Sequence, residues 1–136
     1  MDGFEVVTRH LVMDRDLNAA GHLFGGAMLA WLDEATTTFV MEKTGYTDLV
    51  TVGMDDVNFR ALAHRGDIVA VYCRVAKTGR SSITIDVKAF DHDAATGDKR
   101  EVISCTVTCV CLKDHKPYAY FTSDAYAKWS GRTDVT

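Results

Sequence analysis

Apolar residues cover most sides of a predicted helix over residues 24–41, FGGAMLAWLDEATTTFVM. Gly25 and Gly26 open this segment, and Thr44 with Gly45 follows it as a C-terminal stop, because glycine readily adopts the left-handed conformation that ends helices. A helix that is apolar on most sides belongs in the interior of a protein. The pattern therefore predicts one buried helix.

Strand-type patterns precede and follow this helix. Residues 4–13 are short and β-branched enough for a first strand. Four later segments are rich in Val, Ile, Thr, Tyr and Phe and are separated by short polar stretches that contain glycine: residues 51–59, 68–77, 81–91 and 101–113. The pattern predicts a meander of long antiparallel strands, and Pro117 closes the last regular segment.

Together these elements predict a single α+β domain over residues 1–121, with residues 122–136 as a polar surface extension. An apolar helix needs cover, and the concave face of the sheet is its partner, so we expect the sheet to wrap the helix. One helix is too small to cover strands of about ten residues at about 3.3 Å per residue. Apolar surface should therefore remain for a second copy, which predicts a homo-oligomer.

Charge and targeting features narrow the classes of function. The 15 Lys and Arg residues against 19 Asp and Glu residues give a net charge of −4, so a broad electrostatic footprint for nucleic acid is missing. The longest apolar stretch, residues 23–32, is too short to span a bilayer, and the first residues lack the pattern of a secretory signal. We expect a cytoplasmic protein that binds neither nucleic acid nor membrane and keeps its four cysteines as free thiols.

The residues that could carry chemistry gather between positions 16 and 34. Gly25 and Gly26 at the helix start let another molecule approach the backbone, and the unpaired N–H groups there can bind an oxyanion. The alternative is that these glycines only allow tight helix–sheet packing. Asp33 lies mid-helix in an apolar run, where a carboxylate costs energy unless it is paired or used. The alternative for Asp33 is a solvated helix face that it shares with Glu34.

Two further polar residues, Asn18 and His22, precede the glycines on a predicted loop. From there they could direct hydrogen-bond donors at a carbonyl or a water, and the alternative for each is a turn former or a surface residue. A carboxylate that faces an oxyanion hole can attack an acyl carbonyl or deprotonate a water that does so. Thioesters suit such a sparse site, because the leaving thiolate has a conjugate acid with a pKa of about 8.5 and needs little help from a general acid.

Residues 18–35, NAAGHLFGGAMLAWLDEA, resemble the N-x-x-G-x-x-F-G-G motif, followed by an acidic residue, of the hotdog-fold acyl-CoA thioesterases. That group includes YciA-type bacterial enzymes and cytosolic vertebrate acyl-CoA hydrolases. VTVGMDDVNF, HRGDIV and KTGRSSITIDV are similar, in the same order, to later strands and turns of the group, so the resemblance covers residues 7–117. It implies a long central helix wrapped by an antiparallel sheet, and hydrolysis of acyl-CoA to a free acid and coenzyme A.

The resemblance also implies roles for single residues. Asp33 matches the catalytic carboxylate, which acts as base or nucleophile, and Gly25 with Gly26 matches the oxyanion hole. Family active sites lie across a dimer interface, so Asp33 of one subunit would act beside Asn18 and His22 of the other. Family members often assemble as trimers of dimers, which implies a homohexamer. His22 departs from the Asn, Asp or Thr common at this position, and its role is open between polarising the thioester and a tolerated substitution.

A protein with net negative charge must offer coenzyme A a local basic site. By resemblance, the turn of residues 77–82 helps to bind the coenzyme, and its cations, hydroxyls and N–H groups suit phosphate: Lys77, Thr78, Gly79, Arg80, Ser81 and Ser82. Arg60 forms a second basic cluster with His64 and Arg65, for which a solvated strand connection is the alternative.

Other signals are set aside. Three cysteines and one histidine share strand parity: Cys105, Cys109, Cys111 and His115. Side chains along one strand point in parallel and do not close a tetrahedral zinc site unaided, so we expect no metal site. Asp91, Asp93 and Asp98 are interpreted as hairpin-turn residues.

Two alternatives to hydrolysis remain open. One is a hydratase or dehydratase on the same fold, but these enzymes commonly pair a histidine with an acidic residue on the helix, and this helix offers Asp33 and no histidine. The other is a catalytically silent acyl-CoA-binding protein, because a fold does not prove an activity. We expect no cofactor, since coenzyme A is part of the substrate and of the product.

Overall fold

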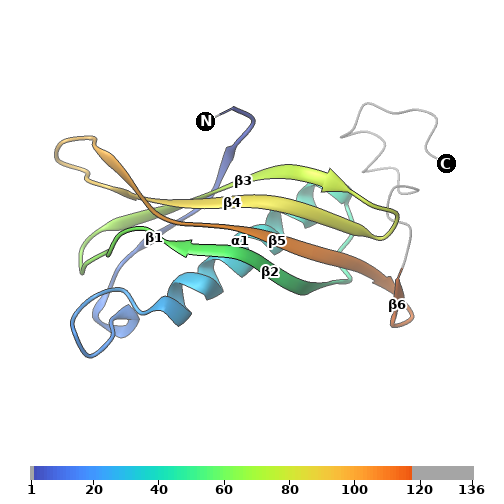
Figure 1. The fold of residues 1–136 in the computed structure, drawn as a ribbon, viewed down its shortest axis with the longest axis horizontal. Helices are drawn as coiled ribbons and strands as arrows, with labels where there is room; N and C mark the ends of the chain where they lie inside the picture. Colours follow the sequence, from blue (N-terminus) through green and yellow to red (C-terminus); the bar gives the residue numbers. More distant parts are fainter. Residues whose placement is uncertain (1, 118–136) are drawn as a thin grey trace.

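A computed structural model describes residues 2–117 of the chain (Figure 1). In chain order its elements are β1 (Glu5–Leu11), a short 3-10 helix (Asp14–Asp16), α1 (Gly25–Thr44), β2 (Leu49–Phe59), β3 (Ile68–Thr78), β4 (Ser82–His92), β5 (Lys99–Lys113) and β6 (Lys116–Pro117). The predicted surface extension, residues 122–136, lies outside the described residues. No helix in residues 2–117 is long and apolar enough to cross a membrane.

The strands form one antiparallel sheet in the spatial order β1-β3-β4-β5-β2, with β6 beside β5. The strands β3, β4 and β5 follow one another as the predicted meander. The prediction is wrong for β2, which pairs with β5 and not with β3. The reason is α1, which crosses one face of the sheet and carries the chain from the β1 edge to the β2 edge (Figure 1).

The helix has the predicted start and stop. It begins at Gly25 and ends before Gly45, whose backbone is left-handed (φ 69°) and whose N–H donates to the Met41 carbonyl at 2.8 Å. One face of α1 is buried, including Leu32, while the opposite face, including Glu34, is exposed. A single chain therefore buries the helix on one side only, because its one sheet covers one side.

The sheet wraps α1 as predicted, and the core lies between them. The largest fully buried side chains come from the helix, from the segment after β1 and from the inner face of β3, β4 and β5: Leu32, Ile83, Ile85, Ile103, Val12, Val40, Val69, Val71, Val87, Val102 and Val107. This packing fixes how the helix lies relative to the strands, and so it positions every side chain that α1 presents to the sheet.

Within residues 2–117 the edge strand β2 has β5 as its one sheet neighbour, and it keeps apolar side chains in contact with solvent. Val50, Val52 and Phe59 are 42%, 58% and 58% exposed. Phe24 and Leu62, on the loops that flank α1 and β2, are 55% and 54% exposed. An apolar edge of this length is a template for pairing with another chain, and it is the leftover surface that the sequence predicts.

Candidate active site

The start of α1 is open and carries no side-chain cap. Phe24 precedes it with an extended backbone (φ −66°, ψ 131°), and no side chain hydrogen-bonds to the first turn from the capping position. A side-chain carbon built on Gly26 would lie 2.6 Å from the Phe24 ring, and one on Gly25 would lie 3.5 Å from the Phe59 ring. Gly26 is exposed, so tight packing on the sheet does not explain it. The helix therefore offers uncapped N–H groups and the positive end of its dipole to an anion.

Asp33 lies two turns further along α1 and faces the edge strand β2. Its side chain is half-buried, and the hydroxyl of Thr51 donates a hydrogen bond to Oδ1 at 2.5 Å. The same hydroxyl lies 3.9 Å from the sulfur of Cys109 on β5. Glu34, in contrast, is exposed. Asp33 is therefore held by the sheet and does not share the solvated face of its neighbour.

The loop before α1 is shaped by Asn18. Its side-chain oxygen accepts hydrogen bonds from the backbone N–H groups of Ala20 and His22, both at 3.0 Å, and its own N–H donates to the His22 carbonyl at 2.8 Å. Asn18 is thus a turn former, whose carboxamide sets the position of His22. The His22 ring meets the His64 ring edge to face, with centroids 5.2 Å apart. Sequence reasoning did not anticipate that His64 lies beside His22.

The predicted coenzyme-binding turn closes the hairpin between β3 and β4. The N–H of Gly79 donates to the Ser82 carbonyl at 2.8 Å, and a side chain on Gly79 would collide with the Ser82 hydroxyl. The carbonyl of Ser81 accepts a hydrogen bond from the N–H of Cys111 at 2.8 Å. Four of the six predicted residues are exposed and two are half-buried: Lys77, Thr78, Gly79, Arg80, Ser81 and Ser82.

Arg60 lies apart from this turn, on the outer face of the sheet. Its Nε and Nη2 donate to the Ser104 hydroxyl at 3.2 and 3.0 Å, and Nε lies 3.3 Å from a carboxylate oxygen of Glu101. In the β4–β5 register, Ser82 pairs with Val110, which is six residues or about 20 Å along β5 from Ser104. One chain therefore does not bring Arg60 to the coenzyme-binding turn.

The predicted catalytic residues also divide between the two ends of the sheet. Thr51, which holds Asp33, pairs with Cys109, and Cys109 pairs with Ile83 at the start of β4. The helix start instead contacts Phe59, which pairs with Ile103, six residues or about 20 Å further along β5. In Figure 1 the start of α1 and the β3–β4 hairpin accordingly lie toward opposite ends of the sheet. Within one chain, the Thr51 contact of Asp33 therefore lies nearer the β3–β4 hairpin than the start of α1 does.

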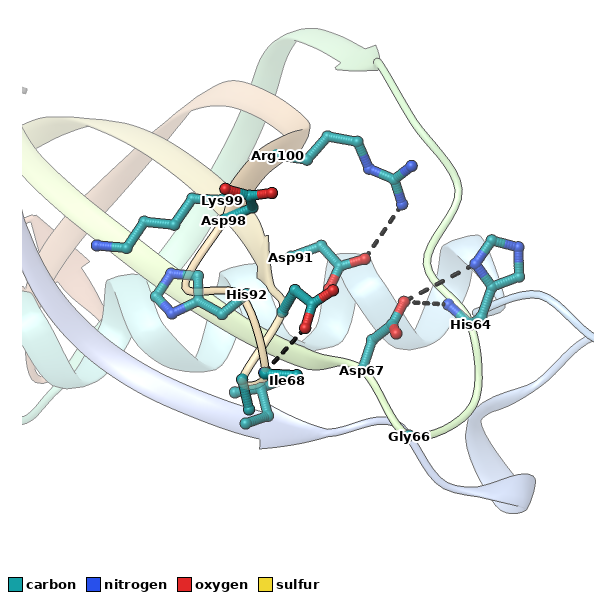
Figure 2. A pocket seen from close by; sticks show the side chains of 12 residues that line it. His64, Gly66, Asp67, Ile68, Asp91, His92, Asp98, Lys99 and Arg100 are labelled. Carbon is teal, nitrogen blue, oxygen red and sulfur yellow. Dashed lines mark hydrogen bonds and ion pairs between the residues drawn. The ribbon is translucent and has the colours of Figure 1, made fainter.

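Sequence reasoning missed a polar network at the end of the sheet opposite the β3–β4 hairpin. A hollow of about 770 Å³ opens where β3 begins and β4 ends, and Figure 2 shows Arg100, Asp91, Asp67 and His64 along it. Asp91 is 9% exposed and lies 3.1 Å from the Arg100 guanidinium. Burial, then the hydrogen bond and the negative charge of Asp67, raise the pKa of Asp91 to about 6.

The interpretation of Asp91 as a turn residue is wrong. Asp91 is part of β4 and faces inward, while Asp93 and Asp98 form the turn: the side chain of Asp93 accepts from the N–H of Ala95 at 2.9 Å, and its backbone N–H donates to the Asp98 carbonyl at 2.9 Å. The alternation of β4 contained the signal, because inward positions 83, 85, 87 and 89 are apolar and position 91 continues their series.

The four cysteines are buried and form no disulfide with one another. Burial raises the pKa of the Cys73 thiol to about 12 and those of Cys105 and Cys111 to about 11, and it also raises the pKa of Cys109. A thiol in this state is a poor nucleophile. In residues 2–117 no group of three or more His, Cys, Asp or Glu side chains is arranged to hold a metal ion.

Comparisons with known proteins agree in family and fold. The family model described as the thioesterase superfamily matches residues 20–97. A protein of Zymomonas mobilis, named an uncharacterized acyl-CoA thioester hydrolase, is 31% identical over 114 residues, which is 83% of this chain and 76% of that protein.

Two solved structures extend the likeness to three dimensions. HI0827, described as a hexameric broad specificity acyl-coenzyme A thioesterase and solved as a mutant enzyme, is 26% identical with a TM-score of 0.84, and the match covers 93% of this chain and 95% of that one. A hexameric hotdog fold thioesterase of Campylobacter jejuni is 31% identical with a TM-score of 0.77, over 88% of this chain and 92% of that one.

Proposed function

Because the chain belongs to the thioesterase superfamily and has its hotdog fold, we propose that it hydrolyses acyl-CoA thioesters to a free carboxylic acid and coenzyme A. The observation that carries the proposal is Asp33, a half-buried carboxylate on the central helix that the Thr51 hydroxyl holds at 2.5 Å. A half-buried carboxylate fixed by a hydrogen bond in this way is suited to take a proton from water or to attack a carbonyl.

In the proposed reaction Asp33 takes a proton from a water molecule, and the resulting hydroxide attacks the thioester carbonyl. The negative charge on the carbonyl oxygen is stabilised by the N–H groups at Gly25 and Gly26. The C–S bond then breaks, the thiolate of coenzyme A leaves, and the proton held by Asp33 passes to it. In the alternative route Asp33 attacks the carbonyl itself, the C–S bond breaks and the thiolate of coenzyme A leaves. Water then hydrolyses the mixed anhydride, which frees the carboxylic acid and Asp33, and a proton from that water passes to the thiolate. Both routes use only water and the chain's own residues.

The division of the predicted residues between the two ends of the sheet supports a site shared by two subunits. In this arrangement the exposed β2 edges of two copies meet, and Asn18, His22 and the helix start of one copy lie near Asp33 of the other. Both solved relatives described above are named as hexamers, and we propose a homohexamer, a trimer of dimers, for this chain. The exposed turn of residues 77–82 would hold the phosphates of coenzyme A.

The test is release of free thiol from a panel of acyl-CoAs, from acetyl to palmitoyl, by the wild-type protein, Asp33→Asn and the control Glu34→Gln. We expect Asp33→Asn to lower kcat at least 100-fold, because loss of a general base costs about 10²–10⁴ in rate. Glu34→Gln should behave like wild type, since Glu34 is exposed.

Activity that survives in Asp33→Asn would remove Asp33 from the proposed role. Absence of turnover with every acyl-CoA, in a wild-type protein that still binds coenzyme A, would favour the silent acyl-CoA binder instead.

A further inference from the structure

The loop that carries Asn18 and His22 rests on a second loop, residues 60–67, which joins β2 to β3. The N–H of Leu23 donates to the Ala63 carbonyl at 2.8 Å, and His22 pairs with His64 as an isolated antiparallel bridge. Gly25 follows Leu23 by two residues. Any displacement of residues 60–67 therefore moves both His22 and the start of α1.

One guanidinium group fastens this second loop to the sheet. Nη2 of Arg100, on β5, donates to the Leu62 carbonyl at 2.6 Å and to Oδ2 of Asp91 at 3.1 Å. Asp91 and Arg100 are also direct partners in the β4–β5 register. Because Arg100 is more than half exposed, its own packing holds it weakly, and the Asp91 carboxylate decides where its guanidinium lies.

Asp67 belongs to the second loop and lies close enough to Asp91 to influence it. After burial, the charge of Asp67 raises the pKa of Asp91, and Oδ2 of Asp67 accepts the N–H of His64 at 2.8 Å. Figure 2 shows these side chains following one another from β4 to the loop. The side chain of Asp91 is only 10% exposed on an otherwise apolar strand face. A carboxyl group buried there costs free energy unless its partners compensate for it. Arg100 is the partner that compensates for the charge of Asp91.

We propose that Asp91 is a positioning residue for the hydrolysis: by holding Arg100, whose guanidinium also binds the Leu62 carbonyl, it fixes residues 60–67, and through them His22 and the oxyanion-binding start of α1. This inference rests on the proposed function. Asp91 itself touches neither Asp33 nor the coenzyme-binding turn, which lies beyond the far end of β4. Loss of the Asp91 carboxylate should therefore lower the rate of the chemical step and leave coenzyme binding intact, because small misplacements of catalytic groups lower the rate strongly.

The chain offers a matched control on the same strand. Asp86 of β4 pairs with Arg74 of β3, its direct partner in the register, at 2.8 Å. This pair has the same chemistry and also joins neighbouring strands, but it lies on the outer face of the sheet. Arg74 continues to the carbonyl of Asp2 and to the Phe4 ring, and not to the loops before α1.

The experiment compares Asp91→Ala, Asp91→Asn and Asp86→Ala with wild type by steady-state kinetics with one acyl-CoA. We expect Asp91→Ala to lower kcat about 10- to 100-fold with KM changed less than about twofold and with one coenzyme A bound per site as in wild type. Asp91→Asn should recover most of kcat, because its amide can accept from Arg100 and donate to Asp67. Asp86→Ala should match wild type.

A second readout, hydrogen exchange of the backbone amides of residues 17–27, does not depend on turnover. Asp91→Ala should speed exchange there at least tenfold, and Asp86→Ala should leave it unchanged. If wild type shows no turnover, the proposed function fails while the exchange measurement still decides whether Asp91 positions this loop.

Equal kcat and equal exchange in Asp91→Ala and Asp86→Ala would overturn the proposal. So would a loss of coenzyme-binding sites or of the oligomer in proportion to the loss of activity, because that result indicates a merely structural role. If Asp91→Ala does not fold, Arg100→Met removes the same tie to Leu62 from an exposed position and is expected to give the same kinetic and exchange changes.

Discussion

β2 and β4 are equally long and similarly rich in β-branched residues, yet they occupy different environments. Each has 11 residues, LVTVGMDDVNF in β2 and SITIDVKAFDH in β4. In β4 the inward Ile83 and Ile85 are fully buried, whereas Val50 and Val52 of β2 are 42% and 58% exposed. Among the described strands, β4 lies between β3 and β5, whereas β2 has β5 as its one neighbour. Strand burial therefore follows from the number of neighbours and not from composition.

The two strands also differ in what they contact, the core for β4 and the proposed site for β2. The central strand β4 supplies core side chains and, at its end, the Asp91 network. The edge strand β2 supplies Thr51 to hold Asp33 and Phe59 to contact the helix start. β2 also has two register shifts against β5, and Asp56, which lies within the second of them, has a left-handed backbone (φ 53°). Irregular edges are frequent beside active sites, because they re-aim side chains.

The largest effect is expected from placing a charge on the β2 edge. Val52→Lys should prevent the proposed pairing of two copies and lower kcat for hydrolysis at least 100-fold. The reason is that a buried unpaired charge is strongly unfavourable at an interface. Light scattering coupled to size-exclusion chromatography and a thiol-release assay would measure both changes. The control Val52→Thr keeps the volume without the charge and should stay assembled. An intact, active oligomer of Val52→Lys would place the interface elsewhere.

The next effect concerns the central strand. Ile85→Ala should lower the free energy of unfolding by about 2–5 kcal/mol, because it opens a cavity in a fully buried site. Urea denaturation followed by circular dichroism would measure the change. Val6→Ala, on the opposite sheet edge at a position that is 40% exposed, is the comparison and should cost much less. Equal losses in the two variants would contradict the contrast between central and edge strands.

The smallest effect on kcat is expected from removing one hydroxyl group from β2, compared with removing one from β4. Thr51→Val removes the hydroxyl that holds Asp33 and should lower kcat about tenfold, which corresponds to about 1.4 kcal/mol for one charge-assisted hydrogen bond. Thr84→Val removes a buried hydroxyl from β4, which lies 3.4 Å from the Thr108 hydroxyl, and should leave kcat unchanged. The thiol-release assay measures both. An unchanged kcat in Thr51→Val would mean that Asp33 needs no support from β2.

Several features were determined by the sequence alone, because they depend on neighbouring residues. The left-handed Gly45 ends the helix, and Gly79 permits the tight β3–β4 turn. The apolar surroundings of Asp33 predict a carboxylate that is paired or used, and its catalytic role stays a prediction. The order of motifs was sufficient to indicate the thioesterase family, and the fold follows from it. Each of these signals lies within a short segment, where backbone preference and hydrophobic pattern act directly.

Tertiary structure alone decided which strands became neighbours and which polar groups met. The path of α1 across the sheet placed β2 beside β5, and only that pairing brought Thr51 to Asp33. Asp91 met Arg100 across a β4–β5 pair and Asp67 across the β3–β4 edge, although in the sequence it resembles a turn residue. The physical reason is that cross-strand contacts depend on register and on the route of the connecting helix, which no local pattern of residues specifies.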